Sequence, residues 1–202
     1  MPNDVGRGRR DHVVRDHHIA RLIQGKWTSP SALSQEGWSI DGCPVNGPAL
    51  AARRDHIVAS WFTAEGSRPR VRAAFSSGNT LQFDQYFEVD DAKPSGRIRV
   101  EWLNNHTALV MWLAAMNSVT RKASLVARKI FTDGTMGPIK QLIDISPGRD
   151  SGIPQLVKND SGFLLAWTSA APSYGVQTVQ FELECWNSKR LEGSFLQGVS
   201  II

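Results

Sequence analysis

The chain has 202 residues, of which 41% are hydrophobic and 21% are charged, and this composition is ordinary for a folded globular protein. No apolar run approaches the roughly 18 residues of a membrane-spanning helix, and the N-terminal region lacks the apolar core of a secretory signal. The net charge is +4, but the basic residues are scattered and do not cluster with aromatic side chains. We therefore expect no membrane span, no nucleic-acid partner, and a cytoplasmic protein unless the chain is a fragment of a secreted precursor.

Residues 1–17 are polar, rich in glycine and arginine, and without periodicity, so they predict a mobile basic tail. Two cysteines, Cys43 and Cys185, are too few for a disulfide scaffold or a metal site, and their spacing leaves open whether they pair. The sequence contains no phosphate-binding glycine motif. We expect neither a metal nor a cofactor.

From residue 18 the chain alternates short β-prone runs with glycine-containing turns and has no helical period, which predicts an all-β protein. A unit of about 50 residues with four strands recurs, and this period is typical of a β-propeller blade. The units lie at 18–36 (the outer half of a blade), 47–91, 96–146 and 151–202, with 194–202 as the last outer strand. We predict one partial propeller over 18–202 with about three and a half blades.

The second strand of each complete unit is an apolar run that ends in tryptophan, at Trp61, Trp112 and Trp167. A blade buries this strand on both faces, so we expect the tryptophans to pack in the core between blades. A partial ring leaves two flanks unpaired. Three outcomes stay open: closure of a small ring by 18–36 with the C-terminal strands, self-association through the exposed flanks, or a longer protein that contains this chain.

Three turns resemble worn copies of the Asp box, Ser-x-Asp-x-Gly-x-Thr-Trp, which precedes the fourth strand in bacterial sialidases and related propellers. They are Ser76-Ser-Gly-Asn-Thr-Leu-Gln-Phe, Thr132-Asp-Gly-Thr-Met-Gly and Gln24-Gly-Lys-Trp. With the tryptophan-ended strands, they make residues 18–184 similar to uncharacterised bacterial propellers of sialidase type. Asp boxes are structural turns that occur in propellers with many functions, so the resemblance concerns the fold.

The resemblance implies a site on one face of the ring, where arginines bind a substrate carboxylate. The loops that open the inner strands and those that follow each tryptophan strand are expected to share this face. Arg97 and Arg149 open successive inner strands, where the family would draw its arginines. The candidate ligand-binding residues are Asp41, Asn46, Arg68, Arg97, Arg149, Asp150 and Tyr174. The chain lacks the opening Arg-Ile-Pro of the family, and no tyrosine has a glutamate at the spacing of the nucleophile pair.

We predict a non-catalytic binding or scaffold module that takes a carbohydrate or another anionic ligand at the loop rim. The alternative is a glycoside hydrolase of exo-sialidase type, active only as an assembly or as part of a longer chain. A degenerate propeller kept as an interaction surface is a third class. Cys43 with His56 or His106, and Glu101 alone, are weaker catalytic candidates, for which a buried thiol and an ion-paired strand carboxylate are simpler interpretations.

Overall fold

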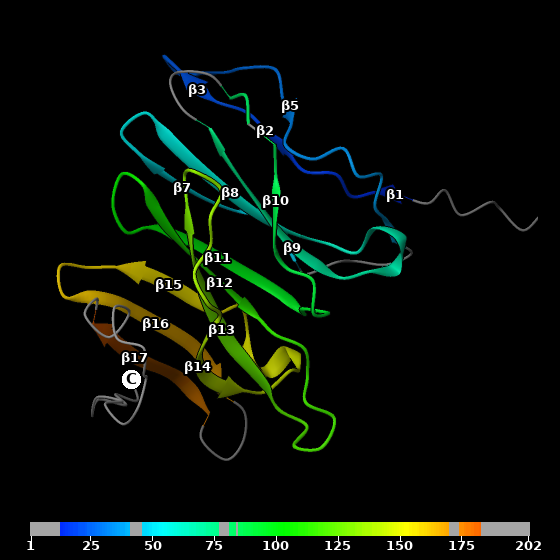
Figure 1. Ribbon diagram of the computed structural model, residues 1–202, viewed down its shortest axis with the longest axis vertical. Helices are drawn as coiled ribbons and strands as arrows, with labels where there is room; N and C mark the ends of the chain where they lie inside the picture. Colours follow the sequence, from blue (N-terminus) through cyan, green and yellow to red (C-terminus); the bar gives the residue numbers. More distant parts are fainter. Residues whose placement is uncertain (1–12, 41–45, 77–80, 84, 170–173, 183–202) are drawn as a thin grey trace, which may run out of the picture.

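The computed structural model describes residues 13–40, 46–76, 81–83, 85–169 and 174–182 of the chain. In these ranges the protein is built from strands, with two short 3-10 turns, η1 (Glu65–Ser67) and η2 (Arg149–Ser151). An N-terminal hairpin is followed by three antiparallel sheets stacked in chain order (Figure 1). No helix in the described part of the chain is long and apolar enough to cross a membrane.

The three sheets are meanders in which each strand pairs with the next one along the chain. The first sheet contains β7 (Ala49–Arg53), β8 (His56–Thr63), β9 (Arg70–Ser76) and β10 (Phe87–Asp90). The second contains β11 (Gly96–Trp102), β12 (Thr107–Leu113), β13 (Ala123–Phe131) and β14 (Lys140–Ile145). The third contains β15 (Gln155–Lys158), β16 (Gly162–Ser169) and β17 (Gly175–Glu182). The predicted fold class, an all-β array of propeller-like antiparallel blades, is confirmed; the strand expected over 194–202 lies outside the described residues.

Residues 13–40 form one irregular antiparallel hairpin (Figure 1). Its paired segments are β1 (Val13–Val14) with β6 (Ser39–Ile40), β2 (His18–Ile19) with β5 (Ser31–Ala32), and β3 (Leu22–Ile23) with β4 (Lys26–Trp27). Gln24 and Gly25 at the tip both have positive φ, as a two-residue hairpin turn requires. Residues 13–17 therefore belong to this hairpin and not to the tail predicted over 1–17, because β1 pairs with β6. Residues 1–12 lie outside the described residues.

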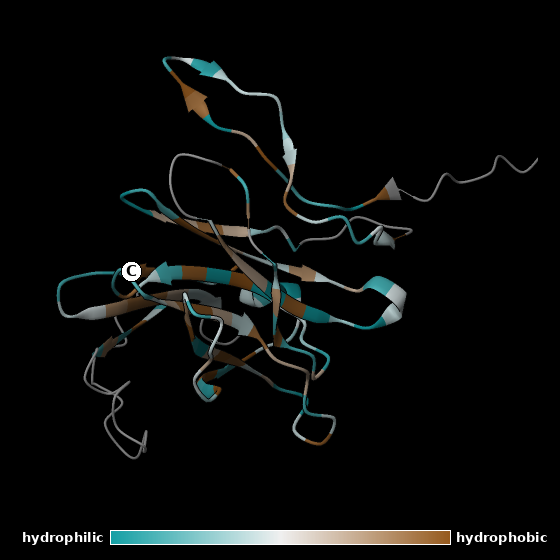
Figure 2. Cartoon of the chain, turned by 45° about the horizontal axis from the view of Figure 1, so that its top comes forward, coloured by the Kyte–Doolittle hydropathy of each residue, from teal (hydrophilic) through white to brown (hydrophobic). Residues whose placement is uncertain are grey.

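The core consists of two apolar clusters, one on each face of the second sheet. All seven residues of β12 are buried, and they alternate: Ala108, Val110 and Trp112 pack with the first sheet, whereas Leu109, Met111 and Leu113 pack with the third. Figure 2 shows long hydrophobic stretches on the stacked strands and mostly hydrophilic loops at their ends. The prediction of a strand buried on both faces is confirmed.

Among the tryptophans of the second strands, Trp112 is fully buried between the first two sheets, and the half-buried Trp167 packs against the cluster between the second and third, as predicted. Trp61 is also fully buried, but it lies on the hairpin side of the first sheet and not between two sheets. Trp61 and Trp112 each donate the indole N–H to a carboxylate that comes earlier in the chain. Trp61 Nε1 lies 2.9 Å from Glu36 Oε1, and Trp112 Nε1 lies 2.6 Å from Asp90 Oδ2. These bonds satisfy a donor that would be costly to bury alone.

Ring closure within one chain does not occur among the described residues. The short strands of the hairpin pair only with one another, and none pairs with β15, β16 or β17. The outcome in which 18–36 closes a small ring with these C-terminal strands is therefore wrong for the described part of the chain. The physical reason is that two complete sheets stand between the hairpin and the third sheet (Figure 1).

Candidate functional site

The inner strands β7, β11 and β15 run side by side in the same direction. At their starts, Asn46 bonds to Ser95 and Arg97, and Arg97 bonds to Ser151. At their ends, Arg53 Nε lies 2.9 Å from Asn105 Oδ1 and Lys158 Nζ lies 2.8 Å from the Leu103 carbonyl oxygen. Because the strands alternate in direction within each sheet, the segments 46–48, 64–69, 91–95, 114–122 and 146–154 share one end of the stack, which we call the loop face.

Arg97 lies at the loop face but is only 8% exposed. Its guanidinium donates to the Ser151 hydroxyl and to the Gly148 carbonyl, and thereby ties the segment 146–151 to the start of β11. Burial lowers the pKa of Arg97, and the charge of Asp150 acts in the opposite direction. The guanidinium expected to bind a ligand carboxylate is therefore used inside the protein.

Asn46 is likewise part of the scaffold. Its Oδ1 accepts the backbone N–H of Arg97 at 3.0 Å, and its Nδ2 donates to the Ser95 carbonyl at 3.2 Å. Gly96 lies directly against this amide with a φ of 90°, and a Cβ atom at that position would overlap the Asn46 side chain. A left-handed glycine is needed there for the close approach.

The remaining predicted residues fall into two separate places. Arg149 and Asp150 are exposed in η2, where Asp150 accepts the Ser146 hydroxyl at 2.7 Å, and Tyr174 is exposed at the start of β17. Arg68 lies apart from them, in the segment between β8 and β9 of the first sheet. Asp41 lies outside the described residues.

Arg68 lines a cavity of about 380 Å³ on the loop face, which we call the Arg68 pocket. Its walls come from the approach to β9 and from the segment around the end of β10. The lining residues are Ser67, Arg68, Pro69, Arg70, Glu88, Asp91 and Lys93. Four of them, Ser67, Pro69, Glu88 and Lys93, were not predicted from the sequence.

The Arg68 pocket carries three cations and two carboxylates, an excess of one positive charge. Arg70 Nη1 and Glu88 Oε1 form an ion pair at 2.9 Å across β9 and β10. Among the described residues, the Arg68 guanidinium and the Lys93 ammonium group have no hydrogen-bond or ion-pair partner, and both residues are exposed. These two cations are available to a ligand.

Two walls of the Arg68 pocket have unusual backbone geometry. Ser67 and Lys93 have φ values of 60° and 57°, and they are two of the six non-glycine residues with positive φ in the described chain. A left-handed conformation costs a non-glycine residue on the order of 1–2 kcal/mol. Such residues gather at ligand-binding sites, where the fold holds them in place, so their presence in one pocket supports a binding role.

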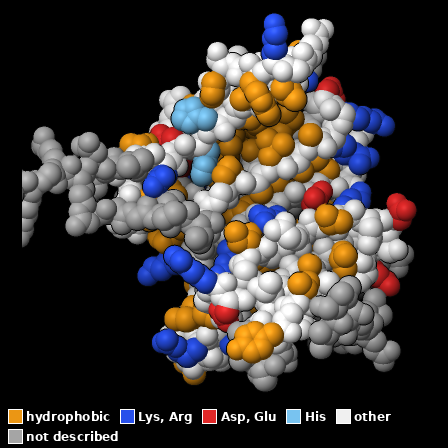
Figure 3. Space-filling model, turned by 180° about the vertical axis from the view of Figure 1, so that it is seen from behind, with side chains coloured by type: hydrophobic (Ala, Val, Ile, Leu, Met, Phe, Trp, Pro, Cys, Tyr) orange, Lys and Arg blue, Asp and Glu red, His pale blue; other side chains and the backbone are white. Residues whose placement is uncertain are grey.

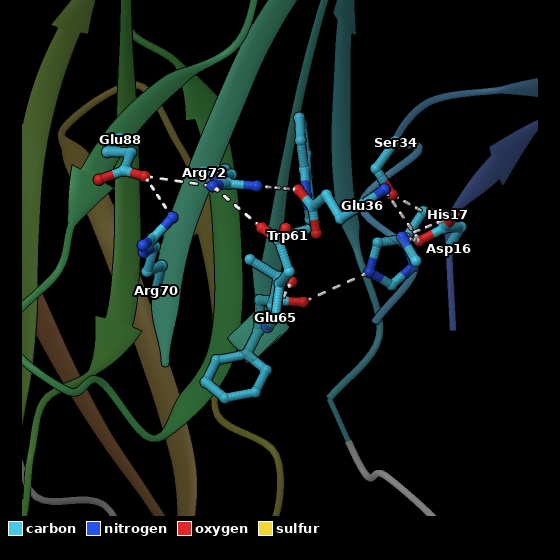
Figure 4. Close-up of polar contacts among 12 residues, drawn as sticks. Asp16, His17, Ser34, Glu36, Trp61, Glu65, Arg70, Arg72 and Glu88 are labelled. Atoms are coloured by element: carbon cyan, nitrogen blue, oxygen red, sulfur yellow. Dashed lines mark hydrogen bonds and ion pairs between the residues drawn. The ribbon is translucent and has the colours of Figure 1, made fainter. Parts of the chain in front are cut away.

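Glu88 connects the Arg68 pocket to an ion network around the buried guanidinium of Arg72 (Figure 4). We call this network the Arg72 cluster: Glu36, Trp61, Arg72, Tyr86 and Glu88. Arg72 on β9 stands opposite Trp61 on β8 and Glu88 on β10 in the strand register. Its Nη1 lies 2.6 Å from Glu36 Oε1, and its Nη2 lies 3.2 Å from Glu88 Oε1. The Arg72 guanidinium carbon lies 4.3 Å from the centre of the Tyr86 ring, a cation–π contact.

Glu36 and Arg72 both keep their charges inside the Arg72 cluster. Burial by itself would raise the pKa of Glu36, but hydrogen bonds from Thr63, Trp61 and Arg72 and the charge of Arg72 outweigh it and hold the pKa below its usual value. Burial also disfavours the charged form of Arg72, yet its bond and attraction to Glu36 raise its pKa overall. Glu36 is therefore a carboxylate at neutral pH and does not serve as a proton donor.

The weaker sequence candidates lie elsewhere. Burial raises the pKa of Glu101, and the charge of Lys158 opposes this shift. His56 and His106 line a cavity of about 130 Å³ at the end of the sheets opposite to the loop face, and Cys43 lies outside the described residues. Across the described ranges, no three His, Cys, Asp or Glu side chains come together as metal ligands.

The fold and the pocket define an all-β, propeller-like repeat protein with a charged cavity on its loop face. No protein-family model matches the chain, and no curated protein matches it. Among solved structures, the chain is similar to a thermostable family-43 glycoside hydrolase, with a TM-score of 0.45 and 11% sequence identity. The likeness covers 65% of this chain, and the chain spans 49% of that hydrolase chain. The sialidase-like resemblance of the turns stays a prediction.

Proposed function

We propose that the protein is a binding module and that the Arg68 pocket takes an anionic saccharide through its carboxylate. The observation that carries this proposal is a pair of cations on one cavity of the loop face, Arg68 and Lys93, which have no partner among the described residues. The left-handed backbone of Ser67 and Lys93 supports it, because the fold maintains an unfavourable conformation at this place.

The chemistry of the lining residues suits a sugar acid. A guanidinium binds a carboxylate with two parallel hydrogen bonds, and an ammonium group adds a point charge, so Arg68 and Lys93 provide complementary contacts. Asp91 and Ser67 offer an acceptor and a hydroxyl to sugar hydroxyl groups. A cavity of about 380 Å³ lies in the range of small-molecule sites.

The test is calorimetric titration of the chain with N-acetylneuraminic acid and galacturonic acid, with galactose as the neutral comparison. We expect binding of an acid and at least a tenfold weaker affinity for galactose. The double variant Arg68→Gln, Lys93→Gln should lose the binding. Arg54→Gln is the matched control, because Arg54 is exposed and left-handed but lies at the opposite end of the sheets.

Two results would refute the binding proposal. One is an affinity for galactose equal to that for the acids, since the cations would then contribute nothing. The other is unchanged acid binding by the Arg68→Gln, Lys93→Gln variant. Retained binding combined with loss in Arg149→Gln would move the site to the third sheet, where the exposed residues Arg149, Asp150 and Tyr174 lie.

A glycoside hydrolase is the second candidate, and the position of Tyr86 favours it. The tyrosine ring packs on Arg72, which also binds Glu36 and Glu88, so a tyrosine and two carboxylates meet at one guanidinium. This candidate predicts release of a fluorogenic leaving group from a sialoside, abolished by Tyr86→Phe. Absence of release from a panel of glycosides, at concentrations where an acid sugar binds, would leave the binding module as the function.

A further inference from the structure

The strand registers identify equivalent positions in the three sheets. In each sheet, the residue two positions before the tryptophan pairs with one residue of the inner strand. These pairs are Ala59 with Leu50, Val110 with Val100, and Leu165 with Leu156. Leu50, Val100 and Leu156 therefore occupy the same place in successive sheets.

These equivalent residues differ in what packs against them. Val100 is 4% exposed because it packs with the first sheet, and Leu156 is 4% exposed because it packs with the second. Leu50 is 50% exposed. We call Leu50, Ala52 and Ile57, which share one side of the first sheet, the Leu50 face. The hairpin is bonded to the outer part of this side through Glu36, whereas the inner-strand position stays open.

The third sheet, at the opposite end of the stack, also exposes an apolar residue at a position that is buried in the other two sheets. The residue three positions before each tryptophan is Val58, Leu109 or Leu164. Val58 and Leu109 are buried against the following sheet, at 0% and 1% exposure, whereas Leu164 on the third sheet is 38% exposed. Its cross-strand neighbour Val157 and, further along the same side, Val176 on β17 are also exposed, and we call the three residues the Leu164 face.

The chain thus carries both halves of one additional contact between sheets. Inside the chain, the Val58 side of the first sheet packs on the Val100 side of the second, and the Leu109 side of the second packs on the Leu156 side of the third. We propose that a second copy of this chain continues the series, so that the Leu164 face of one copy packs on the Leu50 face of the other.

A second copy is favoured over an unrelated partner because the two faces occupy equivalent positions of the repeat. These are the positions that form the two contacts between sheets inside the chain. Apolar side chains at equivalent positions already pack in this manner twice within the chain, and burial of apolar area drives such contacts. Figure 3 shows hydrophobic side chains gathered in a broad area on the back of the molecule, beneath its upper end. Since the two faces differ, the contact is head-to-tail, and two copies related by a two-fold axis can make it twice.

The experiment uses sedimentation velocity on the complete 202-residue chain between 1 and 200 µM, a range chosen to span moderate affinities. We expect a species of at least twice the 22.3 kDa chain mass. Leu50→Asp and Leu164→Asp should each lose it, because each removes one partner of every contact. An equimolar mixture of the two variants should recover a dimer, since one intact Leu50 face then meets one intact Leu164 face.

Val119→Asp is the control, because Val119 is exposed in the segment 114–122 and belongs to neither face. It should associate like the unchanged chain, and circular dichroism should show that all variants are folded. A monomeric unchanged chain at 200 µM would overturn the proposal. So would a dimer of Leu164→Asp alone, which indicates pairing of like faces, or a mixture of the two variants that stays monomeric.

Discussion

The Nη1 atom of Arg72 lies 2.6 Å from Oε1 of Glu36, although 36 positions separate the two residues in the chain. Arg72 is in the middle of the first sheet, and Glu36 belongs to the hairpin that precedes it, so this ion pair fastens the hairpin to the sheet (Figure 4). The exposed fractions of the two side chains are 3% and 5%, and water therefore screens the charges little.

Arg72→Met should destabilise the protein strongly, because it leaves Glu36 as a buried carboxylate without its cation. Removal of one partner of a buried pair costs about 3–5 kcal/mol. Urea unfolding followed by tryptophan fluorescence measures the change in the free energy of unfolding. The double variant Arg72→Met, Glu36→Met should recover part of the loss, since no buried charge is then left unpaired. Equal instability of the single and double variants would contradict this account.

The neighbouring pair of Arg70 and Glu88 provides a contrast within the same sheet. Its side chains are 13% and 39% exposed, although its atoms are only 2.9 Å apart. Ion pairs that water reaches contribute roughly 0–1 kcal/mol. Arg70→Met should therefore lower the free energy of unfolding by no more than about 1 kcal/mol, and 1 M NaCl should reduce the effect further. A loss as large as that of Arg72→Met would show that burial does not distinguish the two pairs.

His17 should make stability fall when the pH drops below neutrality. Burial lowers the pKa of His17 from its usual 6.5, although the Phe62 carbonyl and the carboxylates of Glu36 and Asp16 act against this shift. The unfolded chain then binds a proton at a higher pH than the folded chain, so the stability from this group is complete above 6.5 and decreases as the pH falls through 6.5 towards the folded pKa.

The measurement is the urea midpoint of unfolding at pH 8.0 and at pH 5.5, a range that keeps most carboxylates ionised. His17→Gln should reduce the difference between the two midpoints, because the group that titrates is gone. His106→Gln is the control, because His106 is exposed in the segment between β11 and β12, away from His17, and this variant should behave like the unchanged chain. An unaltered pH dependence in His17→Gln would assign the effect to other groups.

The strands could be predicted from the sequence because their signals are local. An apolar run such as 108–113 and the glycine turns beside it specify a strand whatever its neighbours are. The exposure of Leu50 could not be predicted, since Leu156 has the same register and tryptophan spacing and is buried. The two leucines differ only in whether a sheet packs against them, and that is decided by tertiary structure.

The site was harder to predict for the same reason. Arg97 stands at the start of an inner strand. The local sequence there would be the same if its guanidinium faced solvent, whereas in the structure it donates to the Gly148 carbonyl. One local signal did exist for the Arg72 cluster: the alternation Arg70-Val71-Arg72 on a strand places both arginines on one side of the sheet. The buried carboxylate partner of Arg72, Glu36, comes from a different element, which sequence spacing does not show.

Gly96 and Gly134 offer a matched test of the close approach at the start of β11. Their φ values are 90° and 85°, so alanine is strained equally at both, but only the Cβ at position 96 would overlap the Asn46 side chain. Gly96→Ala should displace Asn46 and lose its bonds to Ser95 and Arg97, each worth about 0.5–1.5 kcal/mol. Calorimetric unfolding should therefore show Gly96→Ala to be about 1–3 kcal/mol less stable than Gly134→Ala. Equal losses would mean that Asn46 moves aside without cost.

Trp112→Phe should reveal the contribution of the bond from the indole N–H to Asp90. The Trp112 side chain is fully buried, and its Nε1 donates to Asp90 Oδ2 at 2.6 Å, so phenylalanine leaves a buried carboxylate oxygen without this donor. A hydrogen bond to a charged group contributes about 1.5–3 kcal/mol, and the smaller ring adds a cavity.

Trp167→Phe is the comparison, because Trp167 ends the equivalent strand and its indole N–H has no partner among the described residues. Chemical unfolding should show the larger loss for Trp112→Phe. A loss in Trp167→Phe as large as that in Trp112→Phe would attribute both effects to ring volume.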